Sequence, residues 1–275
     1  MSAVRVRQHP PPAPLDLCPI VVTTHTRTFA VIPAAGIGAR MSAALPKQYL
    51  PFAGAPLLVR TLSRILRVGW IERCYVVLAP DDRYWDTLVT PHLAQLPPAF
   101  AVAERLRVVR LGGTTRAHSV RAGLRVAHAE GFGDDDWALV HDAARPCLTT
   151  ETIEHLHGSV GNSNVGGLIA IPATDTVKVA TPHTSPNSFP VVERTVPRER
   201  IWLAQTPQLF RLAVLRQALD RFPDATDEAS AVERLGLQPI LVKGHWSNLK
   251  VTLPGDLELA QAIWSLQEDS LSDVG

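Results

Sequence analysis

Short and almost continuously apolar runs alternate with amphipathic stretches from Phe29 onward, and this alternation limits the fold more than any other feature of the chain. The apolar runs are FAVIPA, CYVVLA, LRVVRL, WALVHD, GGLIAIP and PILVKG. Between them lie stretches with helical spacing of apolar residues, such as APLLVRTLSRIL, RAHSVRAGLRVAHA and LFRLAVLRQAL. Strands that are apolar on both faces and alternate with helices are typical of a parallel sheet covered on both sides. We therefore expect a doubly wound α/β fold with a mostly parallel, Rossmann-like sheet.

One segment, TVKVATPHTSPNSFPVVERTV, interrupts the alternation. It predicts two short strands, at 176–179 and 191–195, that are joined by a tip rich in Pro and Ser. We expect a protruding β-hairpin arm at about 174–198. The sequence of the arm fits a contact with a partner subunit and a surface flap equally well.

The two ends of the chain differ in composition from the alternating part. Residues 1–28 are rich in Pro, carry a single acidic residue and lack the long apolar run of a secretory signal. We expect a disordered extension there, with an organelle transit peptide as the alternative. A single domain is expected at 29–268, because 275 residues can bury one large α/β core. Residues 269–275 are expected to form a tail.

The composition of the chain limits the binding partners and the cellular compartment that we expect for it. The formal net charge is only +1, which does not suggest a nucleic-acid or membrane surface. No apolar run has the length that crosses a bilayer. The three cysteines include no CxxC pair, so we expect neither a disulfide framework nor a zinc site. These features favour a cytoplasmic protein.

The first predicted strand runs into a loop with two glycines, PAAGIGARM. Glycine lets backbone N–H groups approach a ligand closely, and loops of this type cradle anionic oxygens. Arg40 and Lys47 follow the glycines, and two cations beside such a loop favour a polyphosphate. A dinucleotide fingerprint would require a small residue where Met41 stands, and a P-loop would require Gly-Lys-Ser/Thr. A plain turn with two solvated cations is the alternative.

Further motifs follow along the chain. In order they are AAGIGARM with LPKQYL, GGTTRAHSV, VHDAARP, IPATDTVK, WLAQTPQLF, ATDEAS and NLKVT. This series resembles the 2-C-methyl-D-erythritol 4-phosphate cytidylyltransferase family, nucleotidyltransferases of the non-mevalonate isoprenoid pathway, over about residues 29–263. The resemblance implies that a substrate phosphate oxygen attacks the α-phosphorus of CTP and that pyrophosphate leaves. It also implies Mg²⁺ as the cofactor.

The resemblance assigns roles in the nucleotide half of the site. Arg40 and Lys47 would stabilise the transition state at the α-phosphate, and Asp142 would hold Mg²⁺. The positions matched to nucleotide binding are Ala34, Ala35, Gly36, Gly38, Gly113, Thr114, Ser119, Asp142 and Ala143. Thr114 departs from the family pattern, because many relatives have Asp there. A turn-capping Asp142 that pairs with Arg145 is the structural alternative.

The second substrate is matched by another set of residues: Arg145, Thr176, Arg198, Thr206 and Lys250. Arg198 and Lys250 would position the phosphorylated alcohol, and with Arg40 and Lys47 they complete the expected catalytic set. In relatives the hairpin arm crosses to a second subunit, so the resemblance implies a homodimer with a shared site. For Lys250 the alternative is a surface cation, the commoner situation of lysine.

Other functions and plainer roles stay open at this point. A cytidylyltransferase for another polyol phosphate, such as ribitol 5-phosphate, would share the CTP half of the site. A dinucleotide-binding dehydrogenase is disfavoured by Met41, and a catalytically silent binding protein would not need the four charged residues Arg40, Lys47, Asp142 and Lys250 together. His141 is expected to be structural. Asp227 and Glu228 are expected to complement the dipole of a helix that begins there.

Overall fold

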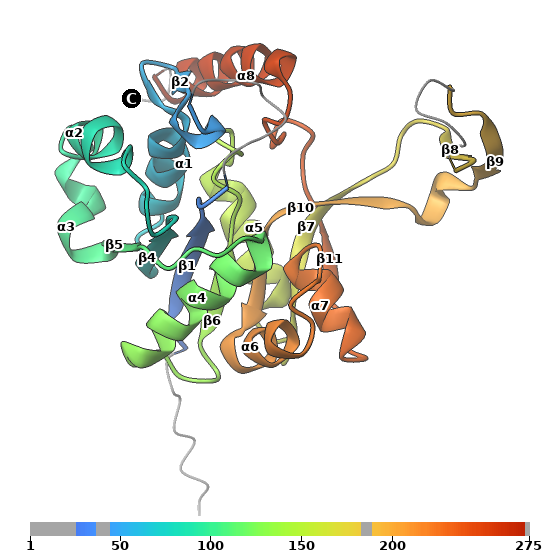
Figure 1. The fold of residues 1–275 in the computed structure, drawn as a ribbon, viewed down its shortest axis with the longest axis horizontal. Coiled ribbons are helices and arrows are strands. Elements are labelled where there is room, and N and C mark those ends of the chain that lie inside the picture. Colours follow the sequence, from blue (N-terminus) through green and yellow to red (C-terminus); the bar gives the residue numbers. More distant parts are fainter. Residues whose placement is uncertain (1–25, 37–44, 183–188, 273–275) are drawn as a thin grey trace, which may run out of the picture.

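The computed structural model describes residues 26–36, 45–182 and 189–272. Within that part, seven strands form one sheet in the order β11-β7-β10-β6-β1-β4-β5 (Figure 1). The strands are β1 (Thr28–Pro33), β4 (Ile71–Val77), β5 (Leu106–Val109), β6 (Trp137–Val140), β7 (Gly166–Pro172), β10 (Trp202–Arg211) and β11 (Ile240–Lys243). All pair in parallel except β10, which is antiparallel to both of its neighbours. The predicted mostly parallel sheet is therefore confirmed.

Helices cover both faces of this sheet, because successive side chains of a strand point to opposite sides. Ala30 and Ile32 of β1 pack in one core with α1 (Leu57–Leu66) and α5 (Thr150–Val160). Phe29 and Val31 pack in the other core with α4 (Arg116–Ala129), α6 (Leu212–Arg221) and α7 (Glu228–Arg234). The doubly wound arrangement is thus a direct result of strands that are apolar on both faces.

Several shorter elements complete the described part of the body. They are the small sheet β2 (Pro51–Phe52) and β3 (Ala55–Pro56), the short helices α2 (Thr90–Leu93) and α3 (Val102–Arg105), the 3-10 turns η2 (Lys47–Tyr49) and η4 (Pro98–Phe100), and the short π-helix η3 (Trp85–Val89). The long helix α8 (Pro254–Ser272) packs Ala260, Ile263 and Trp264 against Leu57 and Cys147. No helix of this part combines the length and the apolar character needed to cross a membrane.

Strand β10 corrects one sequence prediction. The stretch LFRLAVLRQAL was expected to be helical throughout, but Leu209 and Phe210 belong to β10 and α6 begins only at Leu212. Both residues are completely buried and pair with β6 and β7. A pattern of apolar residues cannot distinguish the end of a buried strand from the first turn of the helix that follows it.

The predicted hairpin arm is present. Strands β8 (Val177–Ala180) and β9 (Val192–Val196) pair antiparallel, each one residue later than expected at its start. The arm leaves the body between β7 and β10 and extends away from it (Figure 1). Val191 and Val192 are each 62% exposed, so the arm presents apolar surface to its surroundings.

Candidate active site

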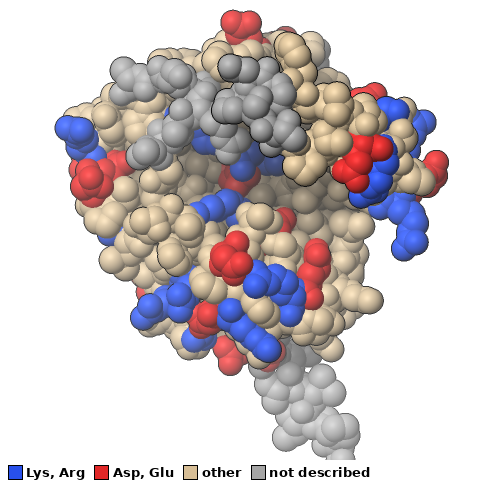
Figure 2. All heavy atoms as spheres, turned by 45° about the vertical axis from the view of Figure 1, so that its right-hand side comes forward, with Lys and Arg blue, Asp and Glu red and all other residues tan. Residues whose placement is uncertain are grey.

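A cleft of about 740 Å³ opens where β1, β5 and β6 end, at the carboxyl edge of the sheet. In open α/β sheets this edge is where ligands gather. Figure 2 shows a face of the molecule on which a hollow holds both basic and acidic side chains. The cleft is lined by Pro33, Ala34, Ala35, Gly36, Lys47, Gln48, Gly113, Thr114, Thr115, Arg116, Ser119, Asp142, Ala143, Ala144, Thr226, Lys250 and Thr252. Segments far apart in the sequence thus contribute to one cavity.

The loop after β1 forms one wall of the cleft. Ala34 donates its backbone N–H to Val77 O at 2.8 Å, which continues the β1–β4 pairing for one more residue. The buried side chain of Gln48 donates to Ala34 O at 2.8 Å and to Gly36 O at 3.1 Å. Gln48 therefore holds the loop in shape, a role that the sequence reasoning missed. Gly38 and Arg40 lie outside the described residues.

The GGTT segment forms the opposite wall. Thr115 caps α4, accepting a hydrogen bond from the backbone N–H of His118 at 3.2 Å. The buried hydroxyl of Ser119 accepts from Gly113 N at 3.3 Å and donates to Thr115 O at 3.2 Å, so it fixes the turn that leads into the helix. Thr114 is exposed at the cleft wall. The start of α4 thus lies at the wall of the cleft, and the first N–H groups of a helix favour anions.

Asp142 lies at the centre of a cluster of cations. Its Oδ1 is 2.8 Å from Nε of Arg116, and its Oδ2 is 2.9 Å from Nζ of Lys250 and 3.4 Å from Nε of Arg145. Burial acts to raise the pKa of this carboxyl, but Arg116, Lys250 and Arg145 outweigh burial and hold the pKa well below its usual value. Asp142 is therefore ionised near neutral pH.

Arg116 links Asp142 to a second carboxylate. Its Nη1 lies 2.6 Å from Oε1 of Glu228, which is completely buried at the start of α7. Burial raises the pKa of Glu228, against the opposing charge of Arg116. The two carboxylates raise the pKa of Arg116 above its ordinary value, although burial alone would lower it. The guanidinium is thus a fixed positive charge in the wall of the cleft.

The sequence reasoning assigned no role to Arg116 and gave Glu228 only a dipole role. Asp227 does cap α7, accepting from Ser230 N at 3.0 Å. Glu228 instead turns inward to Arg116, 112 positions away in the sequence. Arg116 stands inside the GGTTRAHSV motif, and this was the signal available for it. An acidic residue at a helix start carries no local sign that it is buried.

Three other residues around Asp142 are buried and support its position. Nη1 of Arg145 donates to Asn248 O at 2.6 Å, which ties the turn after β6 to the segment before Lys250. The hydroxyl of Thr206 accepts from the backbone N–H of Asp142 at 3.0 Å and contacts Nδ1 of His141 at 3.0 Å. Burial lowers the pKa of His141 to about 4, so this histidine is neutral. Arg145 and Thr206 do not line the described cleft.

Thr176 and Arg198 lie at the base of the arm, and both residues are exposed. Arg198, in the turn η5 (Arg198–Arg200), donates from Nη1 to Thr174 O and so closes the base of the arm. Neither residue lines the cleft described for its own chain. The structure thus brings Lys47, Asp142 and Lys250 together and leaves Thr176 and Arg198 apart from them.

Asp142 is the one acidic side chain among the described residues that line the cleft. Among the described residues, no group of three or more His, Cys, Asp or Glu side chains could hold a metal on its own. Asp142 is nevertheless an ionised carboxylate in the cleft wall. Mg²⁺ typically takes only one or two carboxylates together with phosphate oxygens and water. The Asp142 carboxylate could therefore supply one ligand to Mg²⁺ that arrives with a polyphosphate.

Comparison with known proteins connects this geometry to one family. The family model described as 2-C-methyl-D-erythritol 4-phosphate cytidylyltransferase matches residues 28–266. A relative of that description from Laribacter hongkongensis is 50% identical over 243 residues, 88% of this chain and 97% of its own. One from Dechloromonas aromatica is 46% identical over 237 residues, 86% of this chain and 97% of its own.

Solved structures agree with this match. A crystal structure of 4-diphosphocytidyl-2C-methyl-D-erythritol synthase superimposes with a TM-score of 0.71 at 35% identity, covering 87% of this chain and 98% of that one. The enzyme of Francisella tularensis named 2-C-methyl-D-erythritol 4-phosphate cytidylyltransferase gives 0.69 at 34% identity, covering 86% and 100%. The chain belongs to the 2-C-methyl-D-erythritol 4-phosphate cytidylyltransferase family.

Proposed function

We propose that this protein transfers the cytidylyl group of CTP to 2-C-methyl-D-erythritol 4-phosphate, a step in the formation of isoprenoid precursors. The products are 4-diphosphocytidyl-2-C-methyl-D-erythritol and pyrophosphate. The observation that carries the proposal is the cleft itself, which is lined by Lys47, Arg116 and Lys250 and in which Arg116 and Lys250 pair with the ionised carboxylate of Asp142. Such a site stabilises negative charge, as the transfer of a nucleotidyl group between phosphate oxygens requires.

The reaction needs alignment more than proton transfer. The attacking group is a phosphate oxygen that is already ionised near neutral pH, so no general base is required. Lys47, together with Arg40, is proposed to neutralise the charge that builds up on the α-phosphate. Each charge-assisted contact of this kind is worth roughly 3 kcal/mol or more in the transition state. The N–H groups at the start of α4 and in the loop after β1 would hold the triphosphate and the nucleoside in place.

Asp142 is the proposed ligand of Mg²⁺. Bound there with CTP, the ion would neutralise phosphate charge as the pyrophosphate leaves. Arg116 and Arg145 hold the Asp142 carboxylate in a fixed orientation. Lys250 is the most exposed of the three cations that pair with this carboxylate. Lys250 is therefore the partner best able to turn toward the phosphate of the second substrate.

The protein is further proposed to act as a homodimer whose arms complete the neighbouring sites. Thr176 and Arg198 are exposed at the base of the arm and do not line the cleft of their own chain. The arm also carries Phe189, which is 92% exposed, as well as the exposed Val191 and Val192. Apolar residues on a projecting hairpin are typical of a surface that a partner covers.

The first test is pyrophosphate release with CTP, Mg²⁺ and 2-C-methyl-D-erythritol 4-phosphate, with ribitol 5-phosphate assayed in parallel. Turnover with the branched substrate alone supports the proposal. Turnover with ribitol 5-phosphate alone would keep the CTP chemistry and replace the substrate. Folded protein that binds CTP and turns over neither substrate would overturn the enzymatic proposal in favour of a binding protein.

A further inference from the structure

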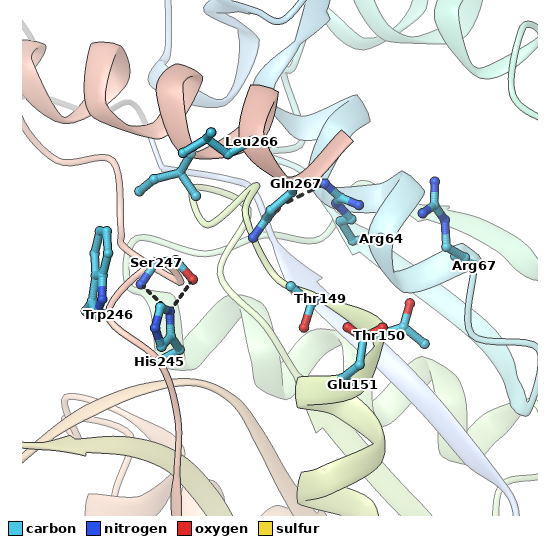
Figure 3. A pocket seen from close by; sticks show the side chains of 11 residues that line it. Arg64, Arg67, Thr149, Thr150, Glu151, His245, Trp246, Ser247, Leu266 and Gln267 are labelled. Atoms are coloured by element: carbon cyan, nitrogen blue, oxygen red, sulfur yellow. Dashed lines mark hydrogen bonds between the residues drawn. The ribbon is translucent and has the colours of Figure 1, made fainter. Parts of the chain in front are cut away.

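A second cavity, of about 630 Å³, lies among α1, α5, α8 and the segment that follows β11 (Figure 3). None of its lining residues lines the cleft. Its volume falls within the range of small-molecule sites, which are mostly apolar with a few placed polar groups. The cytidylyltransferase reaction proposed above does not use this cavity.

The walls of this cavity divide into an apolar side and a cationic side. Trp246, which is 59% exposed, and Leu266, which is 70% exposed, present large apolar surfaces together with Ile263. Arg64 and Arg67 lie on the side away from Trp246 (Figure 3). The two guanidinium groups and the hydroxyl of Thr150 are hydrogen-bond donors for a ligand in the cavity.

Arg64 is built into this cationic side. Its side chain is only 4% exposed, and its guanidinium carbon lies 4.0 Å from the centre of the Trp264 ring. One end of the guanidinium is held by Gln267 at 3.1 Å and by Glu268 at 3.0 Å, while its buried Nε makes no hydrogen bond. Burial lowers the pKa of Arg64, against the opposing charge of Glu268.

The cavity lies against the same two chain segments that carry the catalytic groups. Gln267, in its wall, donates to Cys147 O at 3.1 Å, in the turn that begins at Asp142. Ser247, also in its wall, is followed directly by Asn248, whose carbonyl accepts from Arg145. Both walls of the cavity are thus connected to the chain segments that carry Asp142 and Lys250.

We propose that this second cavity is a regulatory site for a small apolar acid. The apolar body of the ligand, a ring or a branched chain, lies against Trp246 and Leu266. Its single acidic group faces Arg67 and Arg64. Glu151, the exposed carboxylate at the start of α5, adds one negative charge to the rim, so the site selects one acidic group and disfavours several.

The test uses 1-anilinonaphthalene-8-sulfonate, an apolar acid, and its neutral analogue N-phenyl-1-naphthylamine, each titrated into the full-length protein by fluorescence. We expect one sulfonate probe per chain and no displacement by CTP. Leu266→Asp weakens the binding of both probes by about tenfold or more, whereas Arg67→Glu weakens only that of the sulfonate. Leu259→Asp is the matched control, because Leu259 is an exposed leucine of the same helix that does not line the cavity.

Regulation is tested by steady-state kinetics at saturating probe. We expect the sulfonate probe to change kcat in the unaltered protein without competing with CTP, and to leave the kinetics of Leu266→Asp unchanged. Displacement by CTP, or unaltered affinity in Leu266→Asp, would overturn the site. Equal binding of the neutral probe would overturn the ligand class, and occupancy without any change of kcat would overturn the regulatory role. The binding results do not depend on which substrate the enzyme uses.

Discussion

The guanidinium of Arg116 joins Asp142 to Glu228, with Nε 2.8 Å from Oδ1 of Asp142 and Nη1 2.6 Å from Oε1 of Glu228. The three residues come from the start of α4, the turn after β6 and the start of α7. Asp142 faces the cleft, whereas Glu228 is buried behind it. The buried carboxylate therefore holds the arginine, and the arginine in turn orients the carboxylate that faces the cleft.

Arg116→Met is expected to lower the free energy of unfolding by about 3–5 kcal/mol, because it leaves Glu228 buried without its partner. The double variant Arg116→Met with Glu228→Leu is expected to recover most of that stability and to remain deficient in pyrophosphate release. Urea unfolding and the pyrophosphate assay separate the two effects. Arg121→Met is the control on the same helix: its exposed pair with Asp220 predicts a loss of about 1 kcal/mol or less. A fully active double variant would contradict the positioning role.

Lys250→Met is expected to lower kcat about 10²-fold or more and to change stability little. The ammonium is 2.9 Å from Asp142, but 36% of the side chain is exposed, so its removal leaves no buried charge uncompensated by Arg116 and Arg145. Lys243→Met, an exposed lysine of β11, is the matched control and should leave kcat unchanged. A Lys250 variant with normal kcat would show that this residue is only a surface cation.

Gly112→Ala is expected to destabilise the protein and to raise the KM for CTP. A Cβ at this position would lie 2.3 Å from Cβ of Ala35 and 2.6 Å from Leu78 O, so the loop after β1 must move. Gly158→Ala in α5 is the control, since no atom lies within 4 Å of a Cβ there and alanine favours a helix by about 1 kcal/mol. Thermal unfolding and CTP titration would measure both; a Gly112 variant that binds CTP normally would contradict the expectation.

Much of the fold followed from local pattern, because central strands such as β1 and β6 are apolar along almost their whole length. The antiparallel β10 was the exception. Pro207 interrupts its apolar run, and the pairing with β7 shifts between Ala204 and Gln208. Because proline is unfavourable inside a strand, β10 can be recognised only from its pairing with β6 and β7 in the folded protein.

The residues of the cleft that belong to local sequence motifs could be predicted. Those that act through contacts with residues distant in the sequence could not. Lys47, Asp142 and Lys250 belong to recognisable motifs, and the structure brings them to one cleft. Gln48 and Glu228 act through contacts that the chain makes only after folding. Arg145 was assigned to the substrate from its motif, and in the structure its guanidinium contacts Asn248 O and Asp142.

Mixed dimers test the proposed sharing of the arm. Arg198→Ala and Lys250→Met are each expected to be nearly inactive alone. If each arm completes the partner's cleft, subunit exchange between the two variants creates dimers with one intact site. Random exchange should then recover about a quarter of the unaltered activity, because half of the dimers are mixed and each has one of two sites intact. No recovery after demonstrated exchange would place Arg198 in the site of its own chain.

The two described thiols are expected to be unreactive in the folded protein. Burial raises the pKa of both Cys74 and Cys147 to about 12, against a usual value near 9. Only the thiolate reacts with iodoacetamide, so between pH 8 and 10 the unfolded chain is modified and the folded chain is not. Because unfolding releases these protons more readily above about pH 9, the two thiols also lower the free energy of unfolding as pH rises toward 12. Mass spectrometry on a Cys18→Ser background, with and without urea, measures the difference; rapid modification of the folded protein at pH 8 would show that these side chains are accessible.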